Sequence, residues 1–308
     1  MRQTFSEFTM IGTLKEKSSV DVKNNIDIIQ KSFEDGATYS IAKGRIVMEC
    51  NGGEYSLDIY AQDHWKSLTD NGKHKKNITY DRISALAETE IGSKLEITIE
   101  TNRFNDYKNK RGNVSSIDCF SVKDIRTASE DAEEYFEGKI EGVINKIMPE
   151  IVREEETGRL KVEFVGVSFK EEALPHQIFV PADLKDSFED IYHVGDTTVL
   201  EMEILSKSYG KQQKSGGMLG GRHARVNDGF TRTEWCVVNG DDIYDEDTVN
   251  KSGESLIIDP KDIKSAMEER AVRLEAIEND TTTKATKSSG LKGSAKFTEV
   301  TNPEDCPF

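Results

Sequence analysis

The sequence is poor in cysteine and proline and lacks any long apolar run. Only 4 cysteines and 6 prolines occur among 308 residues, and no two cysteines have the Cys-x-x-Cys spacing of a zinc or redox site. The 5 histidines also lack ligand spacing, so we expect no metal and no other cofactor. No segment approaches the ~20 apolar residues of a membrane span, and no signal-peptide pattern opens the chain. These absences favour a cytoplasmic protein with reduced thiols.

Motifs of catalysis are missing as well. No Gly-x-x-x-x-Gly-Lys-Ser/Thr sequence is present to cradle a triphosphate. The acidic runs at 130–134 and 154–156 are typical of turns or linkers rather than of paired catalytic acids, and no pair of nucleophile and base stands out. We therefore expect a binding protein and not an enzyme.

Charge is abundant but mostly of one sign. The hydrophobic fraction is 35%, the charged fraction is 32% and the formal net charge is -16, which is typical of a very soluble protein. This balance excludes binding of nucleic acid by bulk attraction, because phosphate binding needs Lys and Arg where the strand lies. A nucleic-acid binder of this composition must concentrate its cations locally.

An internal repeat of domain length organises the chain. Four pairs of segments match in the same order: 10–14 with 140–144, 44–49 with 158–163, 95–99 with 200–204, and 119–122 with 236–239. Such a period is far longer than that of solenoid repeats. The repeat therefore predicts two related domains of similar size.

Each copy is predicted to contain five strands and one short helix. Apolar and polar residues alternate through 95–99 and 200–204, which is the period of half-buried strands. Helical segments at 80–87 and 181–188 lie between the third and fourth strands, and Trp235, in the last strand of the second copy, is expected in the core. This element order is that of the OB fold, a five-stranded Greek-key barrel that binds oligonucleotides. A β-sandwich or another small barrel with the same strand count is the alternative.

The expected fold class is thus mainly β, with two tandem OB-fold barrels and a flexible C-terminal tail. We divide the chain as follows: OB-fold domain 1 at 1–130, OB-fold domain 2 at 136–245, and a tail at 246–308 with a helix at 261–277, a flexible tether at 279–301 and a docking tip at 302–308. The tether is rich in Thr, Ser, Lys and Gly and too poor in apolar residues to order itself.

Cations and aromatic residues interleave at matching places in the two copies. They do so between the fourth and fifth strands, at 102–112 and 207–232, and again after the third strand of the first copy, at 64–76. Cations can follow the backbone of a single strand while aromatic faces stack on its bases. The alternative is ordinary solvated loops, with 215–221 as a flexible linker; recurrence at one repeat position disfavours it. The predicted nucleic-acid-binding residues are Trp65, Lys66, Lys73, Lys75, Lys76, Arg103, Phe104, Tyr107, Lys108, Lys110, Arg111, Lys207, Tyr209, Lys211, Lys214, Arg222, Arg225, Phe230 and Arg232.

The chain ends on two acids, a cysteine and Pro-Phe. This ending resembles the acidic tip of bacterial single-stranded DNA-binding proteins, whose terminal Phe docks in a basic-rimmed apolar pocket on replication and repair enzymes. The resemblance implies that Pro307 and Phe308 dock on such a partner, with Glu304 and Asp305 supplying the acidic part. The tip has fewer acids than is usual in that family, and Cys306 stands where an aliphatic residue is usual. A chance Pro-Phe ending is the alternative.

Paired barrels, basic-aromatic loops and this tip together resemble a phage-type single-stranded DNA-binding protein. The resemblance implies a protein of DNA replication, recombination or repair that binds single strands largely without sequence preference. It would recruit replication or recombination proteins through the tip and act in the cytoplasm of a phage-infected bacterial cell. One alternative is a virion or complex scaffolding protein that uses its β-barrels for protein contacts, which the net charge of -16 would suit. Another is an accessory domain pair of a nucleic-acid enzyme.

Overall fold

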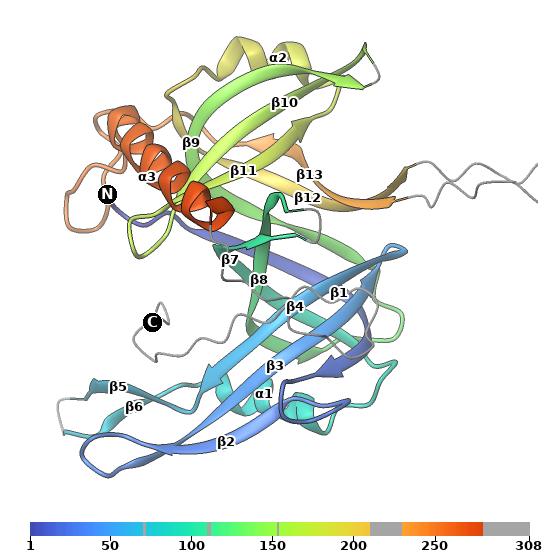
Figure 1. Cartoon of the computed structure of the whole chain (residues 1–308), viewed down its shortest axis with the longest axis vertical. Coiled ribbons are helices and arrows are strands. Elements are labelled where there is room, and N and C mark those ends of the chain that lie inside the picture. Colours follow the sequence, from blue (N-terminus) through green and yellow to red (C-terminus); the bar gives the residue numbers. More distant parts are fainter. Residues whose placement is uncertain (70–71, 110–111, 153, 210–229, 280–308) are drawn as a thin grey trace, which may run out of the picture.

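The computed structural model describes residues 1–69, 72–109, 112–152, 154–209 and 230–279. Two β-barrels lie one above the other, and a long helix lies along one flank of the upper barrel (Figure 1). The chain is mainly β, with helices confined to short insertions and to this flanking helix.

The first barrel is a ring of five strands. They are β1 (Ser6–Ser18), β3 (Thr38–Cys50), β4 (Gly53–Gln62), β7 (Lys94–Lys108) and β8 (Val114–Thr127). β1 pairs with both β3 and β7, and a parallel pair between β4 and β8 closes the ring. The helix α1 (Tyr80–Ser84) and the 3-10 turn η1 (Ala85–Ala87) lie between the third and fourth barrel strands. Strand order and helix position are those of the OB fold.

The second barrel repeats this arrangement. Its strands are β9 (Tyr135–Val152), β10 (Glu155–Val167), β11 (Ala173–Val180), β12 (Thr197–Tyr209) and β13 (Phe230–Gly240), with α2 (Lys185–Ile191) before the fourth. A parallel pair between β11 and β13 closes it. The predicted fold class, a mainly β chain with two tandem OB barrels, is therefore confirmed.

Aligning the two parallel strand pairs shifts two of the four segment matches. Phe120 lies beside Leu57 in the first parallel pair, and Trp235 lies beside Ile178 in the second. In this alignment Phe120 and Trp235 correspond, and the matches of 119–122 with 236–239 and of 44–49 with 158–163 are each displaced by two positions. Because two positions are one full period of a strand, the displaced matches kept the same alternation of inner and outer residues. Trp235 is buried, as expected.

Two further hairpins extend from the first barrel. β2 (Asp27–Ser32) pairs with the outer part of β3, while β5 (His64–Leu68) and β6 (His74–Lys76) form a separate two-stranded ribbon. The ring of Phe33 stacks on that of His74 at 3.8 Å and on that of Tyr39 at 4.2 Å. Asp35 contacts His74 Nε2 at 3.0 Å. These contacts tie the ribbon of β5 and β6 to the hairpin of β2 and β3.

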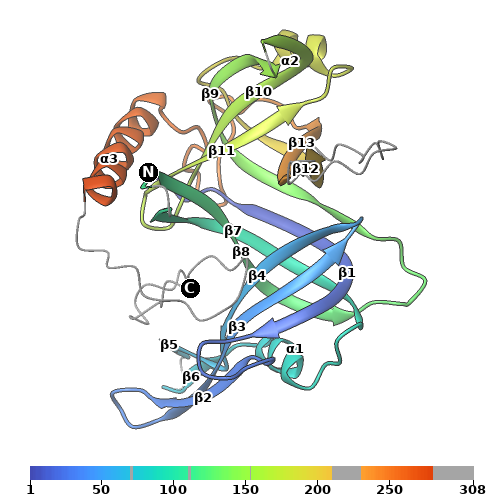
Figure 2. The ribbon, with the colours of Figure 1, turned by 45° about the vertical axis from the view of Figure 1, so that its right-hand side comes forward.

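Backbone pairing between β1 and β9 joins the barrels into one eleven-stranded sheet. The strands run antiparallel from Ser6 opposite Ile140 to Ile11 opposite Tyr135, with Phe8 opposite Gly138 (Figure 2). A Cβ atom at Gly138 would clash with Phe8. The Phe8 ring reaches Trp235 at 5.2 Å in an edge-to-face contact, so a single core cluster spans both barrels.

The segment after the second barrel is packed rather than free. The helix α3 (Pro260–Asn279) places Ile263 and Ala266 in a small apolar cluster with Val143 and Val165 of the second barrel. The boundary drawn at residue 246 therefore does not mark the end of packed structure, because burial of these apolar side chains holds the helix to the barrel. Most of the predicted tether and the whole tip lie outside the described residues.

The buried lysine Lys17 allows a test of what holds α1 and η1 in place. Its Nζ donates hydrogen bonds to the carbonyl oxygens of Leu86, Ala87 and Thr89 at 2.8 to 3.0 Å. We expect Lys17→Met to lower the free energy of unfolding by about 2 to 3 kcal/mol, because three carbonyls lose a charged donor. Chemical denaturation measures this loss. The exposed pair of Lys15 with Glu49 supplies the control: Lys15→Met should leave the midpoint nearly unchanged, and equal shifts for the two variants would contradict the assignment.

Candidate nucleic-acid interface

Strand alternation gives the first barrel a polar outer face on β3 and β4. Ile46 and Leu57 point into the core, while Arg45 and Asp58 lie on the outside, directly opposite each other. Lys43 and Tyr60 form the next outward pair in the same register. We call this surface, with residues 43, 45, 58 and 60, the first outer face. The end of β4 runs from it directly to the ribbon of β5 and β6.

Two arginines converge on one carboxylate in this face. Arg45 donates to Oδ1 of Asp58 through Nε at 3.1 Å and through Nη2 at 2.9 Å. Arg103, from β7, donates through Nη2 to Oδ2 of the same residue at 2.9 Å. The predicted binding residue Arg103 is therefore ion-paired and not a free cation of a loop.

Cys119 lies beside this cluster on β8. Burial raises the pKa of its thiol to about 11, and the charges of Arg103, Asp58 and Arg45 contribute smaller effects of both signs. The thiol is thus protonated and inert near neutral pH.

The second barrel carries an aromatic ring at the corresponding place. Phe179 occupies the position of Asp58 when the two parallel strand pairs are aligned. The guanidinium carbon of Arg159 lies 4.6 Å from the centroid of this ring, and that of Arg232 lies 4.8 Å from it. Arg159 also pairs with the buried Glu234 at 2.9 Å. The two guanidinium groups cover the ring, and Phe179 is only 1% exposed. We call residues 159, 161, 179 and 232 the second outer face, since Lys161 lies opposite Phe179 in the register.

The predicted basic cluster after the third strand forms the ribbon of β5 and β6 with its turn. Lys66, Lys73, Lys75 and Lys76 are exposed, and Trp65 is half-buried. Some of these lysines have acidic neighbours, such as Asp81 at 3.2 Å from Lys76. The structure thus brings this predicted group together on one hairpin.

The hairpin of β7 and β8 packs against the second barrel and against α3. Phe104 lies between His176, at 5.4 Å between rings, and Arg270, at 4.6 Å. Arg270 is 6% exposed and pairs with Asp106 at 2.7 Å. Lys108 donates to a carbonyl of α3 at 2.6 Å. The side chains of this hairpin that were predicted to contact DNA therefore also serve packing between the barrels; among them Tyr107 is half-buried.

Several predicted residues are not placed. Within β12 and β13 the backbone of Lys207 pairs with that of Arg232, and the backbone of Tyr209 with that of Phe230; of these four side chains only that of Arg232 is described. Ten predicted residues lie outside the described residues altogether: Lys110, Arg111, Lys211, Lys214, Arg222, Arg225, Glu304, Asp305, Pro307 and Phe308.

Sequence reasoning missed the outward residues of the strands themselves. Arg45, Tyr60 and Arg159 lie within strands, away from the loops in which cations and aromatic residues interleave. Strand alternation supplies the signal for them. Leu57, Ile59 and Ala61 point inward, so Tyr60, which lies between the last two, points outward.

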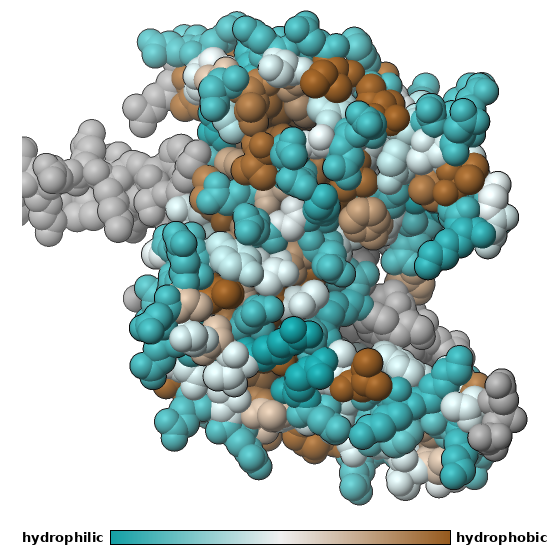
Figure 3. All heavy atoms as spheres, turned by 180° about the vertical axis from the view of Figure 1, so that it is seen from behind, coloured by the Kyte–Doolittle hydropathy of each residue, from teal (hydrophilic) through white to brown (hydrophobic). Residues whose placement is uncertain are grey.

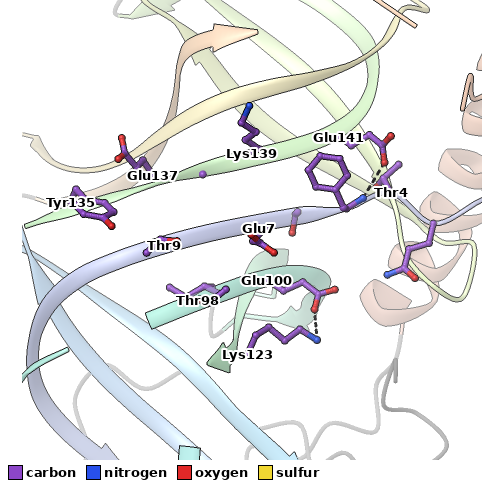
Figure 4. A pocket seen from close by; sticks show the side chains of 15 residues that line it. Thr4, Glu7, Thr9, Thr98, Glu100, Lys123, Tyr135, Glu137, Lys139 and Glu141 are labelled. Carbon is purple, nitrogen blue, oxygen red and sulfur yellow. Dashed lines mark hydrogen bonds and ion pairs between the residues drawn. The ribbon is translucent and has the colours of Figure 1, made fainter. Parts of the chain in front are cut away.

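A groove of about 910 Å³ lies on another side of the molecule, along β1, β7 and β9 (Figure 4). Its charged side chains are Glu7, Glu100, Lys123, Glu137, Lys139 and Glu141. Four acids against two bases make it unsuited to a phosphate backbone. The surface seen from behind is largely hydrophilic, with apolar residues in scattered patches (Figure 3).

Within the part of the chain that the structure describes, no group of three or more His, Cys, Asp or Glu side chains is placed to hold a metal ion. No helix in that part is long and apolar enough to cross a membrane.

Thiol reactivity tests the burial of the cysteines beside these surfaces. Burial raises the pKa of Cys50 to about 12 and that of Cys119 to about 11. Since the thiolate is the nucleophile, we expect neither residue to react with iodoacetamide in the native protein at pH 8, and both to react after denaturation. Peptide mapping by mass spectrometry measures this. Rapid native modification of Cys119 would show that the arginine cluster is open to solvent on that side.

No curated protein matches the chain. Among solved structures, the wild-type single-stranded DNA-binding protein from Thermus aquaticus has a TM-score of 0.43 and 8% identity, over 78% of this chain and 94% of that one. A deletion mutant of that protein has a TM-score of 0.42 and 9% identity, over 80% and 98%. Likeness at this level carries no argument about function. A family model described as YorF matches residues 6–283, and the chain therefore belongs to the YorF family.

Proposed function

We propose that the protein binds single-stranded DNA, largely without sequence preference, and that it serves replication, recombination or repair without being an enzyme. The observation that carries this proposal is the pair of outer faces. Each barrel places two guanidinium groups around one residue of its third strand, a carboxylate in the first barrel and an aromatic ring in the second.

These groups match the chemistry of a single strand. Guanidinium groups bind phosphates in a forked geometry that a lysine does not offer. An aromatic ring can stack on any base, which gives affinity without sequence preference. Tyr60, directly opposite Lys43 on the first outer face, supplies such a ring beside a cation. In the second barrel the ring of Phe179 is buried, and it holds the two guanidinium groups in place at the surface.

The location of the cations reconciles the proposal with the net charge of -16. The first outer face leads along β4 to the ribbon of β5 and β6, whose four lysines are exposed. The acidic groove along β1, β7 and β9 lies elsewhere. Cations are thus gathered where the proposed strand lies, as a binder of acidic composition requires.

The C-terminal tip adds recruitment to this function. Its Pro307-Phe308 ending, preceded by Glu304 and Asp305, suits an apolar pocket with a basic rim. A polar segment before the tip would raise the local concentration of captured partners. The proposal also includes that the protein is of phage type, that it acts in a phage-infected bacterial cell, and that its tip recruits replication or recombination proteins.

A salt titration with labelled oligothymidylate tests DNA binding. We expect tight binding at low salt that weakens as salt rises. The double variant Lys161→Gln/Arg232→Gln should bind several-fold more weakly and reduce the slope of log K against log salt by about 1.4, at ~0.7 for each lost phosphate contact. Lys139→Gln, an exposed lysine of the acidic groove, is the control and should behave as the native protein does. If the native protein did not bind oligothymidylate at low salt, the proposal would be contradicted and a scaffolding role favoured.

Deletion of residues 302–308 tests the tip separately. We expect unchanged affinity for oligothymidylate, because the tip contributes no cation. The native chain should displace a labelled 302–308 peptide from a bacterial repair enzyme that binds tips of this kind, and the shortened chain should not. Phe308→Ala is the matched point variant and should fail in the same competition. Equal competition by the native and shortened chains would remove the docking role, whereas a rise in DNA affinity would show that the tip blocks the DNA face.

A further inference from the structure

Asp58 is the meeting point of two cations from different strands. Its Oδ1 accepts from Arg45 of β3 and its Oδ2 accepts from Arg103 of β7. The side chain of Asp58 is 17% exposed, and those of Arg45 and Arg103 are 18% and 42% exposed. The cluster thus reaches the surface and is open to a ligand from solution.

The geometry around this carboxylate is that of an anion site already filled by the protein. A guanidinium group offers the same forked donors to a carboxylate and to a phosphate. A phosphodiester has two non-bridging oxygens, as the carboxylate has two oxygens, and here each oxygen of Asp58 meets a different guanidinium.

The arginine pair is held in place by the fold. Arg103 precedes Phe104, which is packed between His176 and Arg270. Asp118, on the partner strand β8, contacts His176 Nδ1 at 2.9 Å. The hairpin that carries Arg103 is therefore anchored to the second barrel, so that the pair costs little further ordering when an anion binds.

We propose that Arg45 and Arg103 form a phosphodiester-binding subsite and that Asp58 is a built-in competitor for it. In the free protein Asp58 neutralises the pair, and a phosphate of the bound strand takes over these donors. The inference rests on the proposed binding of single-stranded DNA and deepens it. It assigns to the first barrel a phosphate contact that is weakened by competition from Asp58.

The second barrel shows what the absence of a central acid does. There the corresponding position is Phe179, and the carboxylate that balances Arg159 is Glu234, which is 0% exposed. A strand bound at that face meets guanidinium groups that rest on a buried ring, and it faces no central acid. The two barrels therefore differ: a phosphate must displace Asp58 in the first, whereas no central carboxylate competes with it in the second.

The test is Asp58→Asn, which keeps the shape of the side chain and removes its charge. With oligothymidylate we expect affinity to rise about tenfold at moderate salt with a nearly unchanged salt slope, because the same two guanidinium groups bind phosphate but no carboxylate has to be displaced. Asp58→Glu keeps the carboxylate and should behave as the native protein does. Arg103→Gln in the Asp58→Asn background should remove most of the gain and reduce the salt slope by about 0.7.

Glu201→Gln is the matched charge control. Glu201 pairs with Lys139, a contact that lowers the pKa of Glu201, and it lies on β12 beside β9. The substitution makes the same change in net charge and also releases a cation, away from the first outer face. We expect less than a twofold change in affinity. An equal gain from Glu201→Gln and Asp58→Asn would overturn the subsite, because the effect would then come from net charge.

The remaining outcomes separate this inference from the proposed function. If the native protein binds single-stranded DNA and a folded Asp58→Asn variant binds no better, the subsite is wrong and the function stands. If neither the native protein nor any variant binds, the function itself fails. Thermal melting reports whether each variant is folded. If the Asp58→Asn variant does not fold, the single variant Arg103→Gln provides the test. The subsite predicts that it reduces the slope of log K against log salt by about 0.7 relative to the native protein, and an unchanged slope contradicts the subsite.

Discussion

The antiparallel pairing of β1 with β9 is the interaction on which the rest of the structure depends. β1 pairs with β9 over residues 6–11 and with β3 over 13–18, while β7 lies along its other edge. One strand thus belongs to both barrels and leaves neither barrel an open edge at the junction. The close approach of Phe8 to Gly138 lets the aromatic core continue from one barrel into the other. The relation of the two outer faces is fixed by this pairing.

A second set of contacts ties the hairpin of β7 and β8 to the other barrel. Arg270 is buried and would be costly to bury alone, but Asp106 compensates its charge and the ring of Phe104 covers it. Packing between the barrels therefore uses side chains that look from their composition like a DNA-binding loop. The same contacts position Arg103 on the first outer face, so stability and the proposed binding share one hairpin.

The barrels could be predicted from the sequence, whereas their junction and the outer faces could not. Alternation in 95–99 and 200–204 reports burial on one side of a strand, and burial is what defines a barrel core. The pairing of β1 with β9 uses backbone groups, which leave no side-chain pattern to read. Arg45 and Phe179 sit in strands, where only the closed sheet shows which side faces solvent. Asp58 can be recognised as the shared partner of Arg45 and Arg103 only when β3, β4 and β7 are placed in the same barrel.

Under the proposed function, internal pairing of the cations would let a protein of net charge -16 bind a polyanion and still release it. Arg45 and Arg103 share Asp58, and Arg159 is balanced by Glu234. Binding at such sites exchanges one ion pair for another and does not neutralise a bare cation. The affinity of a cationic groove comes largely from release of counterions by the nucleic acid. When a phosphate replaces a carboxylate at an arginine, counterions are released but the internal ion pair is lost. Under the proposed function, binding would therefore be weaker per arginine than in a basic protein, and dissociation would be correspondingly easier.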